Sequence, residues 1–317
     1  MNILITNDDG ITSKGIIALA ARFKEMGDVV VVAPNKQMSA TSHSITTVSP
    51  IRVQKFDMDN NFFGYSVTGT PADCVKLAIN SLLKSKPDII LSGINHGRNT
   101  GINIMYSGTV AGAAEGHLLG IPSFAISLSS HNEELECDTA ADYAFKIVSE
   151  VLKNNDTKGL FLNINIPATE SSKIKGIKIV RSSNSYWEDE FDKRIDPFGR
   201  PYYWFNGSYI YDTNDENIDD VVLDNGYVAV TPLQFSFTNL NQLEDFKCLE
   251  NILESNIEEG VSDNQNNEPN NELPETKDEK TDVSSNFELA DAEIEKVLAD
   301  REISNNQPQD IQEEIEE

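Results

Sequence analysis

The chain has 317 residues, of which 39% are hydrophobic and 8% aromatic, which is enough apolar side chain to bury a sizeable core. Its 52 acidic and 25 basic residues give a formal net charge of −27, and this charge repels nucleic-acid backbones and anionic lipid surfaces. The composition therefore predicts a globular protein and excludes general binding to DNA or to a membrane surface.

Cysteine content and hydropathy favour a cytoplasmic location. The three cysteines, Cys74, Cys137 and Cys248, have no paired spacing, so neither a disulfide framework nor a thiolate zinc site is indicated. The first apolar run, Met1–Ile5, is shorter than a signal peptide requires, and no later run approaches the length of a membrane span. We therefore expect a cytoplasmic protein without a membrane segment.

Short apolar runs alternate with stretches of helical spacing through the first half of the chain. Val29–Val32 and Ile89–Leu91 are apolar on both faces, as strands of a helix-covered parallel sheet must be. This alternation predicts a doubly wound, mostly parallel α/β fold of the Rossmann-like kind. The expected strands are Asn2–Thr6, Asp28–Ala33, Phe63–Val67, Asp88–Leu91 and Ser123–Leu128, and the expected helices are Lys14–Met26, Ala72–Leu83, Val110–Leu119 and Thr139–Leu152.

Aromatic residues gather between about residues 182 and 225, beyond these elements. They surround Pro197–Gly199 and show no helical spacing, which favours an extended C-terminal β arm or hairpin. Aromatic surface of this extent is rarely left in water, so the arm should pack on the domain or on another subunit.

The chain ends in an acidic segment. Residues 251–317 carry 21 acidic and four basic residues and one aromatic, Phe287, so apolar burial cannot offset the entropy cost of ordering them. We expect a folded domain over residues 1–250, with its boundary near Glu250, and a disordered acidic tail over residues 251–317.

An acidic pair follows the first expected strand. Ligands of open α/β sheets bind outside the carboxyl ends of the strands, and Asp8 and Asp9 lie there. Adjacent carboxylates repel, and a hard cation is the usual reason to keep such a pair. Alternatively, one aspartate caps the helix that follows, although this accounts for only one of the two. A metal site and a helix cap are thus both compatible with the acidic pair.

Two further loops have the composition of anion-binding segments. Pro34–Ser44 combines several hydroxyls with one lysine and one histidine, which could bind an oxyanion. In Ser92–Gly101, three glycines permit close backbone approach, and Asn95 and Asn99 are among the polar side chains that suit a phosphate. The spacing matches neither a P-loop nor a dinucleotide fingerprint.

The start of the expected small-residue helix is a third candidate. Ser107 or Thr109 would cap it, and a helix N-terminus binds anions, although a plain cap is an equally good reading. Thr70–Asp73 is a capping box with a structural role. His117 and His131 have no zinc-like spacing, and we expect them to be structural or surface histidines.

Taken together and in this order, these loops resemble the SurE family of survival proteins, which are metal-dependent phosphatases of nucleoside monophosphates. The resemblance covers Met1 to about Glu250 and leaves the acidic segment outside. The residues that carry it are Ile3–Gly10, Val32–Pro34 with Gln37–Ala40, Gly69–Cys74, Ser92–Asn95 with Gly97, Asn99 and Gly101, and Tyr106–Ala111.

The resemblance implies a specific metal site. Its ligands would be Asp8, Asp9, Ser39 and Asn95, with Asp8, Asp9 and Asn95 also catalytic. Four oxygen ligands without thiolate or imidazole select Mg²⁺ or Mn²⁺, and we expect one ion per subunit. The further donors expected at the substrate phosphate are Asn99, Ser107, Gly108 and Thr109.

The implied reaction is hydrolysis of nucleoside 5′-monophosphates, with 3′-monophosphates as a further substrate class. The resemblance also implies that the aromatic arm joins a homodimer or homotetramer. Either aspartate could accept the proton of the attacking water, and substitution through a phospho-aspartate is the competing route.

Two other functions remain as alternatives. A receiver-like signalling domain also holds Mg²⁺ by an acidic pair, but it needs an aspartate after the third strand and a lysine after the fifth. The loop after Ile89–Leu91 has no aspartate, and Ser129–His131 follows the fifth strand. A non-catalytic phosphate-binding protein would differ from the enzyme only in turnover.

Overall fold

The computed structural model describes residues 1–132, 135, 137–154, 157–236 and 238–251. The chain divides into two compact units, Met1–Thr238 and Asn239–Glu317. The described part of the second unit forms two 3₁₀ helices, Leu240–Gln242 and Glu244–Asn251. The acidic tail expected over residues 251–317 lies, from residue 252 onward, outside the described residues.

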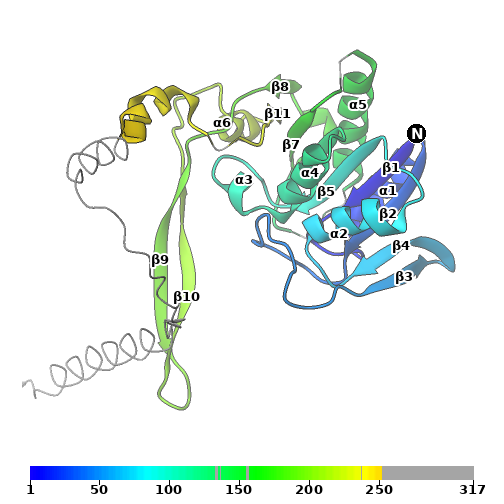
Figure 1. Cartoon of the computed structure of the whole chain (residues 1–317), viewed down its shortest axis with the longest axis horizontal. Coiled ribbons are helices and arrows are strands. Elements are labelled where there is room, and N and C mark those ends of the chain that lie inside the picture. Colours follow the sequence, from blue (N-terminus) through cyan, green and yellow to red (C-terminus); the bar gives the residue numbers. More distant parts are fainter. Residues whose placement is uncertain (133–134, 136, 155–156, 237, 252–317) are drawn as a thin grey trace, which may run out of the picture. The chain divides into compact units, whose positions relative to one another are not determined.

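The first unit is built on a nine-stranded sheet with the order β3-β4-β2-β1-β5-β6-β7-β11-β8 (Figure 1). Neighbours from β4 to β7 pair in parallel, whereas β3 and β11 run antiparallel to β4 and β7. The predicted mostly parallel sheet is thereby confirmed. Its strands are β1 (Asn2–Thr6), β2 (Asp28–Pro34), β3 (Val53–Met58), β4 (Asn61–Val67), β5 (Ile89–His96), β6 (Ser123–Ser129), β7 (Phe161–Pro167), β8 (Ile177–Ile179) and β11 (Val228–Pro232).

Helices cover both faces of the sheet because the central strands are apolar on both. In β1, Ile3 and Ile5 join the cluster that contains residues of α1 and α5, while Leu4 joins the cluster that contains residues of α2. This alternation follows from the two-residue period of a strand. The helices are α1 (Lys14–Phe23), α2 (Pro71–Leu77) with a π-helical turn over Ala78–Leu82, α3 (Asn103–Tyr106), α4 (Gly108–Leu118), α5 (Asp138–Asn154) and α6 (Asp219–Asp224). Among the helices of the described residues, none is both long and apolar enough to cross a bilayer.

Strand β5 is longer than the sequence predicts. We expected it to end at Leu91, but it continues to His96. A Cβ at Gly93 would lie 2.3 Å from the backbone oxygen of Ile126 in β6, and Gly93 has a φ of +140°. Glycine therefore lets the strand continue against its neighbour, and this extension carries Asn95 to the carboxyl edge of the sheet.

The topology reverses beside β1. The chain passes from β1 to β2 on one side, and after β4 and α2 it crosses to β5 on the other side. In such sheets the carboxyl ends of the strands at the reversal form the ligand crevice. The loops after β1, β2 and β5 meet at this crevice.

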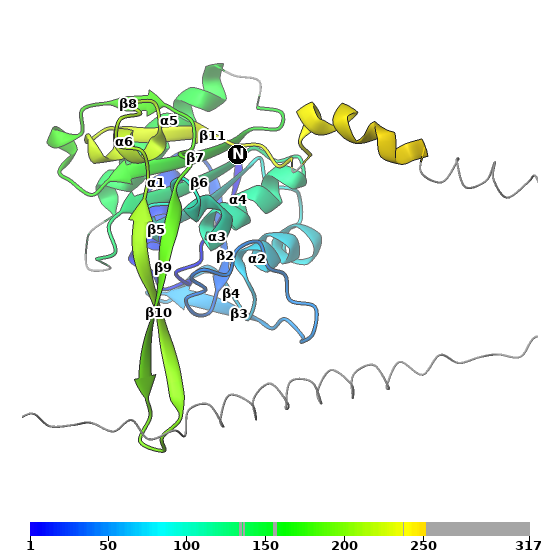
Figure 2. The ribbon, with the colours of Figure 1, turned by 90° about the vertical axis from the view of Figure 1, so that its left-hand side faces the viewer.

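The predicted arm is an antiparallel hairpin of β9 (Tyr186–Ile195) and β10 (Pro201–Ile210). Figures 1 and 2 show it projecting away from the nine-stranded sheet. Most of its side chains are exposed, including Phe191, Trp204 and Phe205 at 65%, 58% and 63%. Phe191 and Phe205 contact each other across the hairpin, with ring centroids 5.3 Å apart, and all three rings remain largely exposed.

Two buried aspartates attach the arm to the loop after β5. Asp219 accepts hydrogen bonds from the backbone N–H groups of Gly101 at 3.0 Å and Ser183 at 2.9 Å. Asp220 accepts hydrogen bonds from the hydroxyl groups of Thr100 at 2.5 Å and Tyr209 at 2.9 Å. Both aspartates are completely buried, so the root of the arm is held by hydrogen bonds to carboxylates, which are stronger than bonds between neutral groups.

We predict that deleting Asn251–Glu317 leaves folding unchanged, because the segment is too poor in apolar residues to extend a core. The melting temperature measured by circular dichroism should move by less than about 2 °C, where about 1 kcal/mol corresponds to about 2–4 °C in a domain of this size. As a control, a chain that ends at Asn225 loses β11 from the sheet and should not fold. A large drop after the first deletion would place the boundary elsewhere.

Candidate functional site

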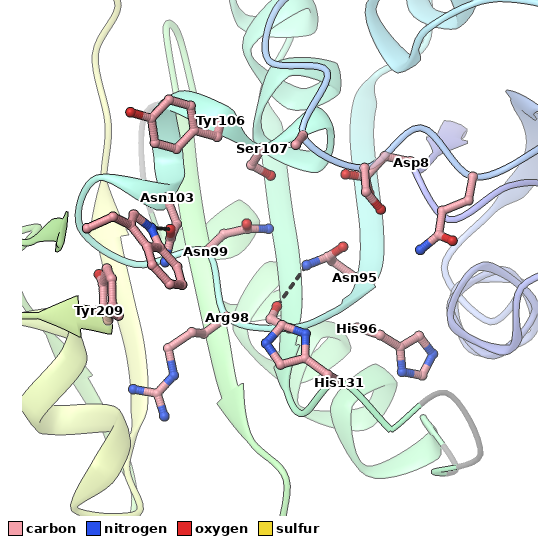
Figure 3. Close-up of a pocket in the computed structure, with 15 residues that line it drawn as sticks. Asp8, Asn95, His96, Arg98, Asn99, Asn103, Tyr106, Ser107, His131 and Tyr209 are labelled. Atoms are coloured by element: carbon pink, nitrogen blue, oxygen red, sulfur yellow. Dashed lines mark hydrogen bonds between the residues drawn. The ribbon is translucent and has the colours of Figure 1, made fainter. Parts of the chain in front are cut away.

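A cavity of about 580 Å³ opens at the crevice beside β1 (Figure 3). It is lined by the loops after β1, β2, β5 and β6, by α3 with the start of α4, and by the root of the arm. Its lining residues are Asp8, Gln37, Ser39, Ala40, Asn95, His96, Gly97, Arg98, Asn99, Asn103, Tyr106, Ser107, His131, Trp187 and Tyr209. Chain segments more than 200 residues apart thus contribute to one cavity.

Asp8 is a nearly buried carboxylate at this cavity, with 4% of its surface exposed. Burial raises its pKa to about 6, and the nearby carboxyl group of Asp9 raises this pKa further. The hydrogen bond that the Thr109 hydroxyl donates to Oδ1 acts in the opposite direction and lowers the pKa. Gly108 allows this approach, since a Cβ there would lie 2.8 Å from the Cβ of Asp8. A cation would offset the cost of holding this charge away from water.

Asp9 faces the end of β5, where its Oδ2 accepts the backbone N–H of His96 at 3.2 Å. Neither aspartate caps α1, whose first turn is capped by Ser13. The capping alternative for the pair is therefore wrong.

Asn95 presents its oxygen rather than its nitrogen to a ligand. Its Nδ2 donates to the backbone oxygen of Gly97 at 2.8 Å (Figure 3), which orients the amide and leaves Oδ1 as an acceptor. Ser39 lines the same cavity from the loop after β2. That loop is tied to the site because the Met38 N–H donates to the backbone oxygen of Asp8 at 2.7 Å.

The donor set fits a hard cation. Two carboxylates, one amide oxygen and one hydroxyl are the groups that Mg²⁺ and Mn²⁺ accept as ligands. In the part of the chain that the structure describes, no three His, Cys, Asp or Glu side chains cluster so as to hold a metal. Of the four expected ligands, Asp8, Ser39 and Asn95 line the cavity, whereas Asp9 is not among the lining residues and accepts the backbone N–H of His96 beside it.

Of the four residues expected at the substrate phosphate, two line the cavity and two contact Asp8. Ser107 lines the cavity and caps α4, since its Oγ accepts the Val110 N–H at 3.0 Å. Asn99 also lines it, and its side chain donates to Ser127 at 2.9 Å. Thr109 is completely buried and directs its hydroxyl to Asp8. Gly108 packs against Asp8, so this helix start both lines the cavity and holds the carboxylate.

Several lining residues were missed by sequence reasoning. His131, expected to be structural or on the surface, lines the cavity above Gly97, where a Cβ would lie 2.7 Å from its ring. Trp187 and Tyr209 come from the arm, and nothing in their local sequence signals a site. By contrast, His117 stacks on Phe161 with ring centroids 5.4 Å apart, as a structural role predicts.

Fold and cavity together define a class: an open α/β protein with an oxygen-donor site at the topological switch point and a helix start beside it. Residues 3–189 match the model of the family described as survival protein SurE. The chain therefore belongs to the SurE family, and the resemblance seen in its motifs is confirmed.

Known members of the family agree with this assignment. The chain is 44% identical over 249 residues to the 5′-nucleotidase SurE of Flavobacterium johnsoniae, covering 77% of this chain and 96% of that protein. It is 43% identical over 248 residues to the 5′-nucleotidase SurE of Thermosipho africanus, covering 77% and 97%. The crystal structure of the SurE protein from Aquifex aeolicus matches with a TM-score of 0.70 and 41% identity, over 79% of this chain and 100% of that one.

We predict that Thr109→Val weakens Mn²⁺ binding about 10- to 100-fold, the usual effect of removing a hydrogen-bond donor that orients a metal ligand. Valine has nearly the shape of threonine but cannot donate to Asp8. Thr109→Ser keeps the hydroxyl and should bind Mn²⁺ close to normally. Titration calorimetry measures both affinities, and equal affinity in Thr109→Val and the unmodified protein would contradict the role given to this hydroxyl.

Proposed function

We propose that this chain is a metal-dependent phosphatase that hydrolyses nucleoside 5′-monophosphates, with 3′-monophosphates as a second substrate class, using one Mg²⁺ or Mn²⁺ per subunit. The observation that carries the proposal is that Asp8, Ser39 and Asn95 line one cavity together with the cap of α4. The names of the relatives, 5′-nucleotidase, support the same reaction. The location expected from the cysteine content is the cytoplasm.

In this proposal Asp8, Asp9, Ser39 and Asn95 hold the cation. When bound, the cation supplies positive charge that neutralises phosphoryl oxygens and lowers the pKa of water. The start of α4 directs backbone N–H groups and the partial positive end of the helix dipole at the phosphate. In a protein of net charge −27, these groups let a phosphate dianion enter the cavity.

The hydrolysis balances with groups of this chain. The water oxygen bonds to phosphorus, and the ester P–O bond breaks. One carboxylate, Asp8 or Asp9, accepts one proton of the water and passes it to the departing nucleoside oxygen, which leaves as an alcohol, while the other proton stays on the new phosphate oxygen. If an aspartate instead attacked phosphorus, a phospho-aspartate would form first, and rapid acid quenching of a single turnover would trap it.

The receiver alternative needs features that the site does not offer. A receiver domain requires a phosphoacceptor aspartate after the third strand, but the end of β5 and the loop after it bring Asn95 and Asn99 to the cavity. After β6 the cavity is lined by His131 rather than by a lysine. A non-catalytic phosphate-binding protein would bind phosphate with the same donors but release none from an ester.

The test is release of inorganic phosphate from AMP. Excess chelator should abolish it and added Mn²⁺ or Mg²⁺ should restore it. Asp8→Ala and Asp8→Asn should each lower kcat/KM by more than about 100-fold, because both remove a charged ligand, whereas Asn95→Ala and Ser39→Ala should cost about tenfold. Circular dichroism should show that all variants are folded. Full activity in chelator or in Asp9→Ala would refute the metal-dependent mechanism.

We also propose that the arm joins subunits into a homodimer or homotetramer. The rings of Tyr202, Tyr203 and Trp204 are 41%, 56% and 58% exposed in a single chain, and aromatic residues are enriched at subunit interfaces. Burying them against another copy of the chain would remove this apolar surface from water.

Light scattering at micromolar concentration should therefore give a mass at least twice that of one chain. Replacing Tyr202, Tyr203 and Trp204 together by alanine should shift the mass toward 35.1 kDa, because the apolar contact would be lost. The melting temperature of the triple variant at low protein concentration controls for misfolding. A monomeric mass for the unmodified protein would refute the proposal.

A further inference from the structure

Two aromatic rings from the root of the arm share the cavity with the proposed phosphate site. Trp187 of β9 and Tyr209 of β10 are directly paired across the hairpin, and their ring centroids are 5.3 Å apart at 50°. Paired residues project from the same face of a hairpin, and both line the cavity that Asp8 lines. Figure 3 shows Tyr209 and Tyr106 on one side of the cavity and Asp8 on the other.

The polar atoms of both rings are bound within the protein. The Trp187 Nε1–H donates to Oδ1 of Asn103 at 2.9 Å. The Tyr209 hydroxyl lies 2.9 Å from Oδ2 of Asp220 and 2.7 Å from Oγ of Ser185. Burial raises the pKa of this hydroxyl to about 12, so the group stays neutral at physiological pH. The rings are therefore held in place, and they offer the cavity π surface rather than hydrogen bonds.

We propose that Trp187 and Tyr209 form a stacking platform for the nucleobase of the substrate, an inference that rests on the function proposed above. Stacked on the platform, the base would place its phosphate toward Asp8 on the other side of the cavity. Aromatic surface in a cavity that also binds a phosphate suits a ligand with one planar apolar end and one anionic end. The platform selects nucleoside monophosphates over phosphate esters that have no base.

The same geometry predicts that the site accepts nucleotides with different bases. Every nucleobase has a π face, so stacking discriminates little between them. The guanidinium of Arg98, which also lines the cavity, is paired with Asp224 at 2.7 Å and lies 3.6 Å from Asp220. The side-chain oxygen of Asn103, Oδ1, accepts the hydrogen bond from Trp187 Nε1–H. Since these groups are engaged, recognition by base edges is minor, and purine and pyrimidine nucleotides should be used similarly.

The kinetic test compares AMP with ribose 5-phosphate, which has the same phosphate and sugar but no base. Trp187→Ala should raise KM for AMP by about 5- to 150-fold, the effect of losing one base–aromatic stack, while kcat/KM for ribose 5-phosphate stays unchanged. Trp187→Phe keeps a ring and should retain most of the preference for AMP. Tyr186→Ala alters the neighbouring arm residue, whose side chain points to the opposite face, and should leave the ratio of the two substrates unchanged.

A binding test gives a readout that does not depend on turnover. The chain has two tryptophans, so in Trp204→Phe all indole fluorescence comes from Trp187. Adenosine and AMP should quench it saturably, and ribose 5-phosphate should not. An equal loss of activity toward both substrates in Trp187→Ala, or no quenching by adenosine, overturns the platform. Quenching by adenosine without phosphate release from any ester would instead refute the proposed phosphatase and leave the platform standing.

Discussion

The burial of one carboxylate, Asp8, organises the rest of the site. A carboxylate that is 4% exposed loses most of its hydration, which costs free energy. Contacts from the surrounding elements offset part of this cost. Thr109 donates a hydroxyl to it, Gly108 gives it room, and the backbone at Met38 ties the loop after β2 to its carbonyl. These contacts bring α4 and the loop that carries Ser39 to one crevice, where a cation would offset the negative charge.

A second buried pair, Asp219 and Asp220, connects this crevice to the arm. Its carboxylates accept hydrogen bonds from the backbone N–H of Gly101, in the loop after β5, and from the hydroxyl of Tyr209, at the end of β10. The root of the arm therefore supplies part of the cavity wall, in addition to the subunit contact proposed for the rest of the arm. Since the same hairpin carries exposed aromatics farther out, the proposed assembly and the proposed base platform are features of one element.

Much of the core fold could be predicted because its signals are local. Runs such as Val29–Val32 identify buried strands by their composition, and Thr70 with Asp73 forms the predicted capping box at α2. Other elements lacked such a signal. Strand β3 is half-exposed and without an apolar run, and the polar residues after Leu91 concealed the continuation of β5, which depends on Gly93 packing against β6.

The sequence by itself determined the α/β class, the family and the acidic pair after β1, because strand periodicity and short motifs are properties of neighbouring residues. Only the tertiary structure decided that Thr109 serves Asp8 while Ser107 caps α4, that Asn95 turns its oxygen outward, and that His131, Trp187 and Tyr209 line the cavity. The contact of Thr109 with Asp8 and the lining of the cavity depend on which strands lie side by side and on how Asp219 and Asp220 attach the arm. Contacts between residues 100 or more positions apart leave no mark in the local pattern, since they are set by packing across the whole sheet.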